Sequence, residues 1–187
     1  MGIKSKIVLF CFILALLTCT LVIIRQSGEQ GMERAALSLN QPMARVAYIE
    51  KLGKMNAIVF YDWGTYPEYF GTARLKKTIF GWHFTGGSTS AEPKEHKFGW
   101  SFNGLKGDLK GDVPHYAGMY SGKIYDSEIV SMWKKSRSSG KELPCQIIEY
   151  GAGERFWFYL SEQEEGPDSV ILARSRTGEI LEQYPSE

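Results

Sequence analysis

The sequence predicts an α+β protein that is mostly β: an N-terminal transmembrane helix, one short amphipathic helix, and then an antiparallel β-sheet, sandwich or open barrel. The first observation behind this is an uncharged apolar run at residues 7–24. The second is a series of short segments rich in β-branched and aromatic residues, separated by turns that contain glycine. Long alternation of strands and helices is absent, which argues against a doubly wound α/β fold.

The apolar run is long enough to be a membrane anchor. Residues 7–24 read IVLFCFILALLTCTLVII, and a helix of this length rises about 27 Å, close to the roughly 30 Å hydrocarbon core of a bilayer. A cleaved signal peptide is one alternative, but its apolar region is usually shorter and ends at a small-x-small site, which does not follow here. Lipid attachment at Cys19 is another, although Thr18 does not suit that motif. We expect an uncleaved signal-anchor.

The charges around the run predict its orientation. Lys4 and Lys6 precede it and Arg25 follows it, and positive charge tends to stay cytoplasmic. The predicted location is therefore the cell membrane, in a single pass, with the C-terminal domain outside the cytoplasm. The opposite orientation would put that domain in the cytoplasm. The predicted parts are a cytoplasmic tail at 1–6, a transmembrane anchor at 7–24, a linker at 25–40 and an extracytoplasmic β-rich domain at 41–187.

Composition narrows the class of protein. The 187 residues include 22 basic and 21 acidic side chains, and this balance gives no indication of nucleic-acid binding, which usually requires a basic surface. Of the three cysteines, Cys11 and Cys19 lie in the apolar run, so Cys145 has no disulfide partner within the domain. A domain stabilised by its core alone fits a bacterial cell envelope better than a disulfide-rich secreted module.

Residue patterns locate the elements of the domain. Val46, Ile49 and Leu52 recur every three residues between Pro42 and Gly53, which predicts an amphipathic helix at 42–52. Two hairpins are expected at 145–160 and 169–184, because strand-like segments flank glycine-containing turns there. Other extended segments are predicted at 57–61, 70–84, 115–125 and 128–134, and the one at 70–84 is expected to be broken by Gly71 and Gly81.

This layout resembles that of uncharacterised membrane-anchored envelope proteins of Bacillus-like bacteria. The features that carry the resemblance are the N-terminal anchor, an AIVFY strand, a KKTIFGW segment followed by two glycines, and an ending with RFWFYL and ILARSRTGEIL. The resemblance implies an envelope location and brings no activity and no functional residues with it.

Two similar segments are the main candidate for a binding site. Residues 80–86 read FGWHFTG and residues 98–104 read FGWSFNG. If the two segments are paired strands, their aromatic side chains share one face. That face is either core or an exposed platform for a wall polymer or a lipid surface, because indole rings are amphipathic. The candidate ligand-binding residues are Trp82, Trp100, Phe84 and Phe102.

No recognisable catalytic arrangement is present. His83, His96 and His115 do not have metal-ligand spacing. The segment Gly86-Gly87-Ser88-Thr89-Ser90 lacks the last glycine of a nucleophile elbow. Cys145 begins an apolar strand, where a free cysteine usually serves packing. We assign no catalytic residue, no metal ligand and no cofactor.

These observations favour a binding or interaction module at the cell envelope, and they make an enzyme the less favoured reading. Its partners are the membrane, through the N-terminal helix, and a wall polymer, a lipid surface or another envelope protein. The alternatives are an envelope hydrolase whose site is assembled only in three dimensions, and a structural subunit of a membrane assembly.

Overall fold

The fold is a helix-capped stack of three antiparallel β-sheets. A computed structural model describes residues 3–38, 44–63, 66–91, 95–105, 116–162 and 169–185. Each sheet has four strands, and all the described strand pairs are antiparallel. No sheet closes on itself among these residues. The prediction of a mostly β protein with antiparallel sheets is therefore confirmed.

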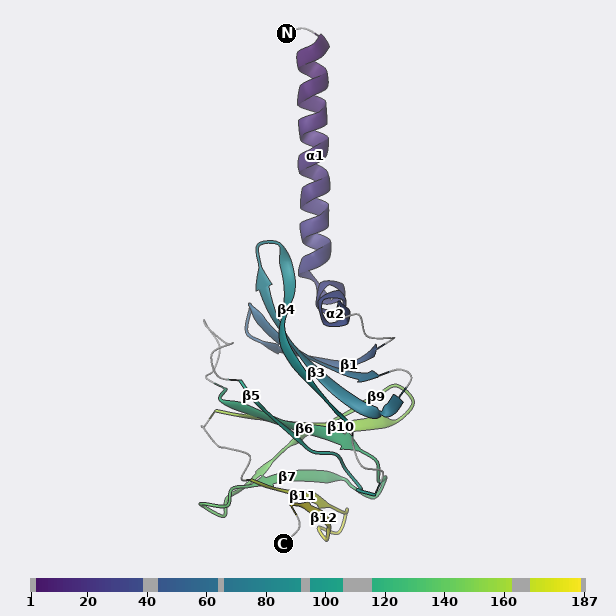
Figure 1. The fold of residues 1–187 in the computed structure, drawn as a ribbon, viewed down its shortest axis with the longest axis vertical. Coiled ribbons are helices and arrows are strands. Elements are labelled where there is room, and N and C mark those ends of the chain that lie inside the picture. The colour runs from purple at the N-terminus through teal and green to yellow at the C-terminus, as the bar shows by residue number, and fades with distance from the viewer. Residues whose placement is uncertain are drawn as a thin grey trace.

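Two helices precede the sheets. Helix α1, Ile3–Ser27, projects away from the rest of the molecule, and α2, Glu29–Leu37, lies across the first sheet (Figure 1). Across the described ranges, no helix combines the length and the apolar character that a membrane crossing needs. Much of the stretch predicted as a linker, 25–40, lies in α1 and α2. Met32, Ala35 and Ala36 of α2 are buried against the sheet.

Sheet A follows α2 and is a simple meander. Its strands are in sequence order, so each strand pairs with its successor in the chain. The strands are β1 (Ala44–Leu52), β2 (Asn56–Trp63), β3 (Tyr66–Thr78) and β4 (Gly81–Ala91).

After sheet A, the chain alternates between sheets B and C, two strands at a time. Sheet B has the order β5-β6-β10-β9, with strands β5 (Ser101–Gly104), β6 (Gly118–Ile124), β9 (Gln146–Tyr150) and β10 (Glu154–Ser161). Sheet C has the order β12-β11-β7-β8, with strands β7 (Ser131–Lys135), β8 (Glu142–Pro144), β11 (Val170–Arg174) and β12 (Ile180–Tyr184).

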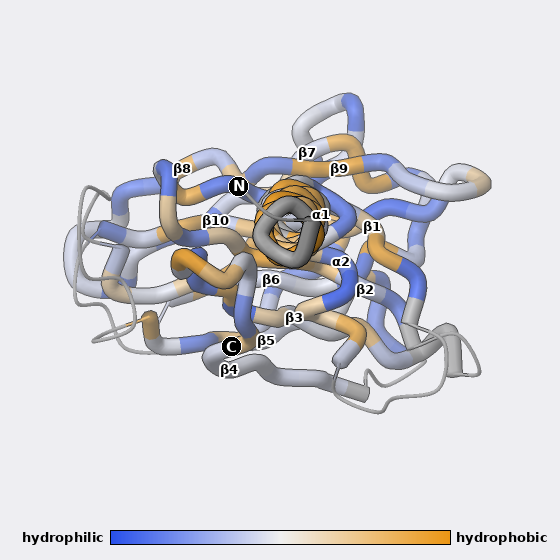
Figure 2. The backbone as a smooth tube through the Cα atoms, turned by 90° about the horizontal axis from the view of Figure 1, so that it is seen from above, coloured by the Kyte–Doolittle hydropathy of each residue, from blue (hydrophilic) through white to orange (hydrophobic). Residues whose placement is uncertain are grey.

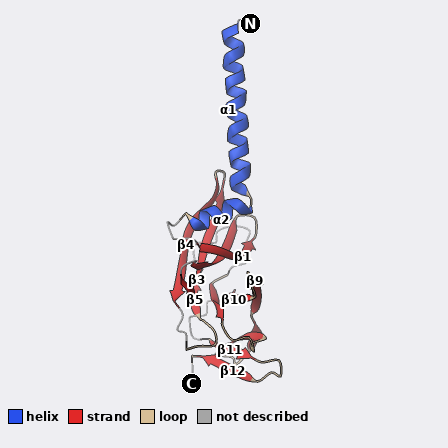
Figure 3. Ribbon diagram, turned by 90° about the vertical axis from the view of Figure 1, so that its right-hand side faces the viewer, coloured by secondary structure: helices blue, strands red, loops and turns tan. Residues whose placement is uncertain are grey.

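The layers are stacked in the order α2, sheet A, sheet B, sheet C (Figure 3). One cluster of buried side chains fills each of the three interfaces. Sheets A and B are the two inner layers of the stack and are covered on both faces. Their strands therefore carry apolar residues at successive positions rather than at alternate ones.

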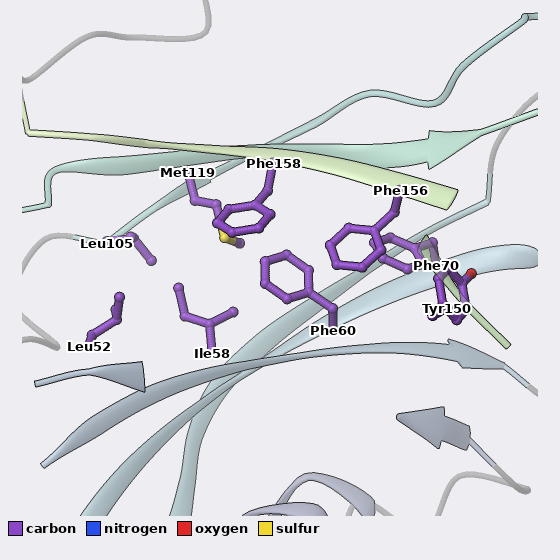
Figure 4. Close-up of a cluster of buried hydrophobic side chains, with 9 residues drawn as sticks. All are labelled: Leu52, Ile58, Phe60, Phe70, Leu105, Met119, Tyr150, Phe156 and Phe158. Carbon is purple, nitrogen blue, oxygen red and sulfur yellow. The ribbon is translucent and has the colours of Figure 1, made fainter. Parts of the chain in front are cut away.

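Strand β2 illustrates this two-sided burial. Ala57 and Val59 pack in the cluster under α2, whereas Ile58 and Phe60 pack in the cluster shared with sheet B. Strand periodicity of two sends successive side chains to opposite faces. Figure 4 shows the cluster between sheets A and B, where the ring centroid of Phe60 lies 4.8 Å from that of Phe156.

The amphipathic helix predicted at 42–52 is wrong over its described part, because Ala44–Leu52 is strand β1. The register of β1 on β2 shifts between Val46 and Tyr48. A bulge of this kind adds one residue to the strand, so Val46 and Ile49 lie on the same face although they are three residues apart. The spacing of three between Val46 and Ile49 therefore comes from this bulge, whereas Leu52 packs on the opposite face of the sheet.

Both C-terminal hairpins are confirmed. Strands β9 and β10 pair around residues 151–153, and β11 and β12 pair around residues 175–179. The extended stretch predicted at 70–84 is divided between β3 and β4, and the chain reverses at Ile79 and Phe80, next to the break expected at Gly81. The break expected at Gly71 is not present, because Gly71 lies within β3, where it pairs with Tyr61 of β2.

Candidate functional site

The two FGWxF segments lie in different sheets, so the aromatic face expected from their pairing does not form. Trp82 pairs with Lys77 of β3 in sheet A. Phe98 instead bridges to Ile124, and Phe102 pairs with Tyr120 of β6, in sheet B. Their similarity in sequence reflects similar local patterns in two separate environments.

Trp100 and Phe102 are half-buried against the cluster between sheets B and C. The ring centroid of Trp100 lies 5.0 Å from that of Tyr184, and the ring centroid of Phe102 lies 4.8 Å from that of Tyr120. The indole nitrogen of Trp100 is buried and has no hydrogen-bond partner among the described residues. The surroundings of these two side chains are those of packing residues.

Trp82 and Phe84 line a groove between α2 and β4. They pack at the edge of the cluster under α2 and face a hollow of about 300 Å³. The groove has an aromatic wall and a polar rim. Its lining residues are Gly31, Arg34, Ala35, Ser38, Phe80, Trp82, His83 and Phe84.

An apolar hairpin tip adjoins this groove. Strands β3 and β4 are joined by Ile79 and Phe80, whose exposed fractions are 78% and 67%. The neighbouring turn between β1 and β2 lies at the same end of the sheet, because the backbone N–H of Lys77 donates to the carbonyl of Met55 at 2.7 Å. We call residues 53–55 and 76–82 the turn end of sheet A.

A separate charged network lies at the contact of sheets A and B. The carboxylate of Asp62 on β2 accepts hydrogen bonds from Arg45 at 2.7 Å, from Lys123 at 3.2 Å and from the hydroxyl of Tyr150 at 2.8 Å. Arg45 also pairs with Glu154 at 2.8 Å. The network therefore joins two strands of sheet A to three strands of sheet B.

Burial makes this network structural rather than catalytic. Asp62, Lys123 and Tyr150 are 5%, 6% and 9% exposed, so a ligand has no direct path to them. Desolvation raises the pKa of the Tyr150 hydroxyl, and the nearby Asp62 carboxylate adds to the rise. A phenol that stays protonated at neutral pH serves as a hydrogen-bond donor to Asp62 and not as a base.

Cys145 is not an activated nucleophile. Its thiol pKa is raised to about 12, chiefly by burial and against the opposing effect of Lys134. Nucleophilic cysteines need the thiolate, which a raised pKa disfavours. Lys134 itself is 1% exposed, with its ammonium 5.1 Å from the ring centroid of Tyr159 and 5.5 Å from that of Tyr120, and burial lowers its pKa.

The described histidines are separated in space. His83 is exposed on the rim of the groove, and Nδ1 of His96 lies 2.7 Å from Oε1 of Glu182. His115 falls outside the described residues. The described ranges contain no group of three or more His, Cys, Asp or Glu side chains that could hold a metal ion.

Sequence reasoning singled out Trp82 but missed the residues beside it at the turn end of sheet A. Two signals were available. The two-residue turn is Ile79-Phe80, although such turns favour Asn, Asp and Gly. The chain also contains no acidic residue between Glu68 and Glu92, while it has Arg74, Lys76 and Lys77 there.

Comparisons of this chain with protein-family models, with curated proteins and with solved structures found no match. The structure and the chemistry of the described residues therefore carry the functional reasoning that follows.

Proposed function

We propose that the protein is a single-pass membrane protein whose β-rich domain is an interaction module on the outer side of the membrane. The observation that carries the proposal is α1, whose described apolar side chains are exposed on all sides. Figure 2 views the helix end-on and shows hydrophobic residues around its circumference. Twelve large apolar side chains from Ile7 to Ile24 are between 47% and 69% exposed.

Such a helix needs an apolar environment. A helix that is hydrophobic around its whole circumference is stable inside a protein core or a bilayer. Each exposed Val, Leu, Ile or Phe forgoes about 1.5–3 kcal/mol relative to full burial. The rest of the described chain covers none of these side chains completely, and a bilayer would cover them all.

An interaction role is favoured over hydrolysis because two candidate reactive groups in the described part of the chain, Asp62 and Cys145, are inaccessible or unactivated. The buried carboxylate of Asp62 is held by three donors, and burial raises the pKa of Cys145. The groove beside α2 and the exposed turn end of sheet A instead offer apolar and basic contacts. We infer that contacts at this end, rather than catalysis, are the function of the domain.

Fractionation and labelling of the full chain test the proposal. The full chain should stay with membranes after a carbonate wash and dissolve only in detergent, at the mass of the uncleaved polypeptide. Leu14→Asp with Leu17→Asp should release it, because each aspartate at the centre of a span costs about 2.5–3.5 kcal/mol. Leu14→Ile with Leu17→Ile is the matched control and should behave like the parent.

A cysteine on the far side of the domain reports orientation. Ser138 is exposed in the turn after β7, so Ser138→Cys should react with an impermeant maleimide in intact cells. Labelling only after lysis would mean that the domain faces the cytoplasm. Recovery of the parent chain in the soluble fraction would contradict the anchor.

A further inference from the structure

The tip of the β3–β4 hairpin breaks the usual chemistry of a tight turn. Thr78 pairs with Gly81, so Ile79 and Phe80 alone form the turn, and they are the most exposed large apolar residues of the described sheets. Gly81 has a φ of 108°, a left-handed conformation that suits glycine and lets the chain reverse at once. Exposed apolar residues where polar ones are normal indicate an interaction surface.

The charged side chains at the turn end of sheet A are all lysines. Lys76 and Lys77 end β3, and Lys54 lies in the neighbouring turn. In the sequence, the whole stretch between Glu68 and Glu92 lacks acidic residues. A surface that combines bare apolar side chains with lysines matches an anionic lipid surface, where apolar groups enter the acyl boundary and cations meet phosphates.

Trp82 adds the third component of a membrane interface. It lies across from Lys77 in the hairpin, and the Lys77 ammonium is 5.8 Å from the centroid of the indole ring. Tryptophan and lysine both place an apolar body towards lipid and a polar end towards water. The pair would therefore lie at headgroup depth, directly behind the apolar tip.

The position of the tip relative to α1 places it at this depth. The hairpin rises beside the end of α1 nearest the domain, and Figure 3 shows the same arrangement from the side. The apolar run ends at Ile24 and the helix at Ser27, a further rise of about 4.5 Å. A headgroup layer is roughly 5–8 Å thick on each side of the hydrocarbon core, so the end of α1 and the tip beside it fall within it.

We propose that the β3–β4 hairpin docks on the bilayer that holds α1, with Ile79 and Phe80 inserted at the acyl boundary and Lys76 and Lys77 on anionic lipid phosphates. This inference rests on the proposed membrane anchor. Two separate contacts with the membrane fix the tilt of the domain, which a single helix followed by a bend at Gly28 does not do. Sheet C then faces away from the membrane.

Depth-dependent quenching in vesicles tests the docking. The experiment uses three variants of the full chain, in each of which alanine replaces Cys11, Cys19 and Cys145. Each variant carries one environment-sensitive dye on a single new cysteine, at Phe80→Cys, Leu14→Cys or Ser138→Cys. Vesicles contain phosphatidylcholine, about one third phosphatidylglycerol, and a lipid with a nitroxide near the top of its acyl chain. The label at position 80 should be quenched by this shallow nitroxide. The label at position 14 should be quenched in a second set of vesicles whose nitroxide is near the end of the acyl chain, and the label at position 138 should be quenched in neither.

The lysines provide the second measurement. Lys76→Gln with Lys77→Gln should reduce the docked fraction reported at position 80, by about fivefold in the docked-to-undocked ratio for each lysine at low salt. Lys135→Gln with Lys141→Gln changes the net charge equally on sheet C, where both lysines are exposed, and should have no effect. An equal effect of the two pairs would overturn the proposed role of the tip lysines.

The labels separate this proposal from the one on which it rests. Quenching at position 14 with none at position 80 would overturn the docking and leave the anchor intact. No quenching at position 14 would contradict the anchor itself.

Discussion

Replacing Asp62 with asparagine removes the charge at the centre of the network between sheets A and B. Asp62 receives hydrogen bonds from Arg45, Lys123 and Tyr150 at 2.7–3.2 Å. Lys123 has 8% of its side chain exposed, so the substitution removes a carboxylate that lies 3.2 Å from a nearly buried ammonium. Removing one partner of a buried ion pair costs about 3–5 kcal/mol, whereas an exposed pair is worth about 0.2–1 kcal/mol.

Urea unfolding of the full chain in detergent micelles, followed by tryptophan fluorescence, measures this cost. With a dependence of about 2 kcal/mol per molar urea, the midpoint for Asp62→Asn should fall by roughly 1.5–2.5 M. Glu29→Gln is the control, because its partner Lys51 is 54% exposed. The control should lower the free energy of unfolding by less than about 1 kcal/mol.

A double-mutant cycle shows whether the network acts as a unit. Lys123→Met should cost less than Asp62→Asn, because Asp62 keeps Arg45 and Tyr150 as donors. The double variant should cost less than the sum of the two single variants, because both single variants remove the same contact between Asp62 and Lys123. A cost below about 1 kcal/mol for Asp62→Asn, or strict additivity, would refute this account of the network.

Three further outcomes are expected. Arg45 lowers the pKa of Glu154 through a hydrogen bond. The stabilisation from this ion pair is therefore present above about pH 4.5, the value in the unfolded chain, and is lost as the pH falls through the lower pKa of the folded chain. Acid titration of Glu154→Gln should lack this loss of stability, which solvent screening limits to about 0.5 kcal/mol. The pKa of the Cys145 thiol is raised to about 12. The thiol should therefore react with a maleimide at least about thirtyfold more slowly in the folded chain than in the urea-unfolded chain. Equal rates in the two states would contradict the partial burial of this thiol. Gly122→Ala would place a Cβ 1.8 Å from the carbonyl oxygen of Gly99. The melting temperature of this variant should drop by several degrees, corresponding to about 1–3 kcal/mol. In the control Gly104→Ala, the new Cβ meets no atom within 4 Å, and the melting temperature should change little.

The groove between α2 and β4 adjoins the apolar tip of the β3–β4 hairpin. Phe80 belongs both to the apolar tip and to the lining of the groove. If the tip enters the headgroup layer, the groove opens next to the lipid surface, and any ligand that binds it would approach along the membrane. The groove and the tip therefore form one continuous surface at the turn end of sheet A.

Local patterns in the sequence predicted those elements that depend on local interactions. The C-terminal hairpins follow from glycine-containing turns between segments rich in β-branched and aromatic residues, and both are present. The helix expected at 42–52 failed because the bulge between Val46 and Tyr48 depends on pairing with β2. A spacing of three residues cannot by itself distinguish a helical face from a bulged strand.

The sequence by itself determined the mostly β character, the apolar run at 7–24 and the basic stretch between Glu68 and Glu92. Only the tertiary structure decided that the two FGWxF segments lie in different sheets, that Asp62 meets Lys123 across an interface, and that the Ile79-Phe80 turn rises beside α1. The physical reason is that periodicity shows which residues share a face within an element. Which faces meet depends on the order of strands in the sheets and on the stacking of the layers, and both join residues far apart in the chain.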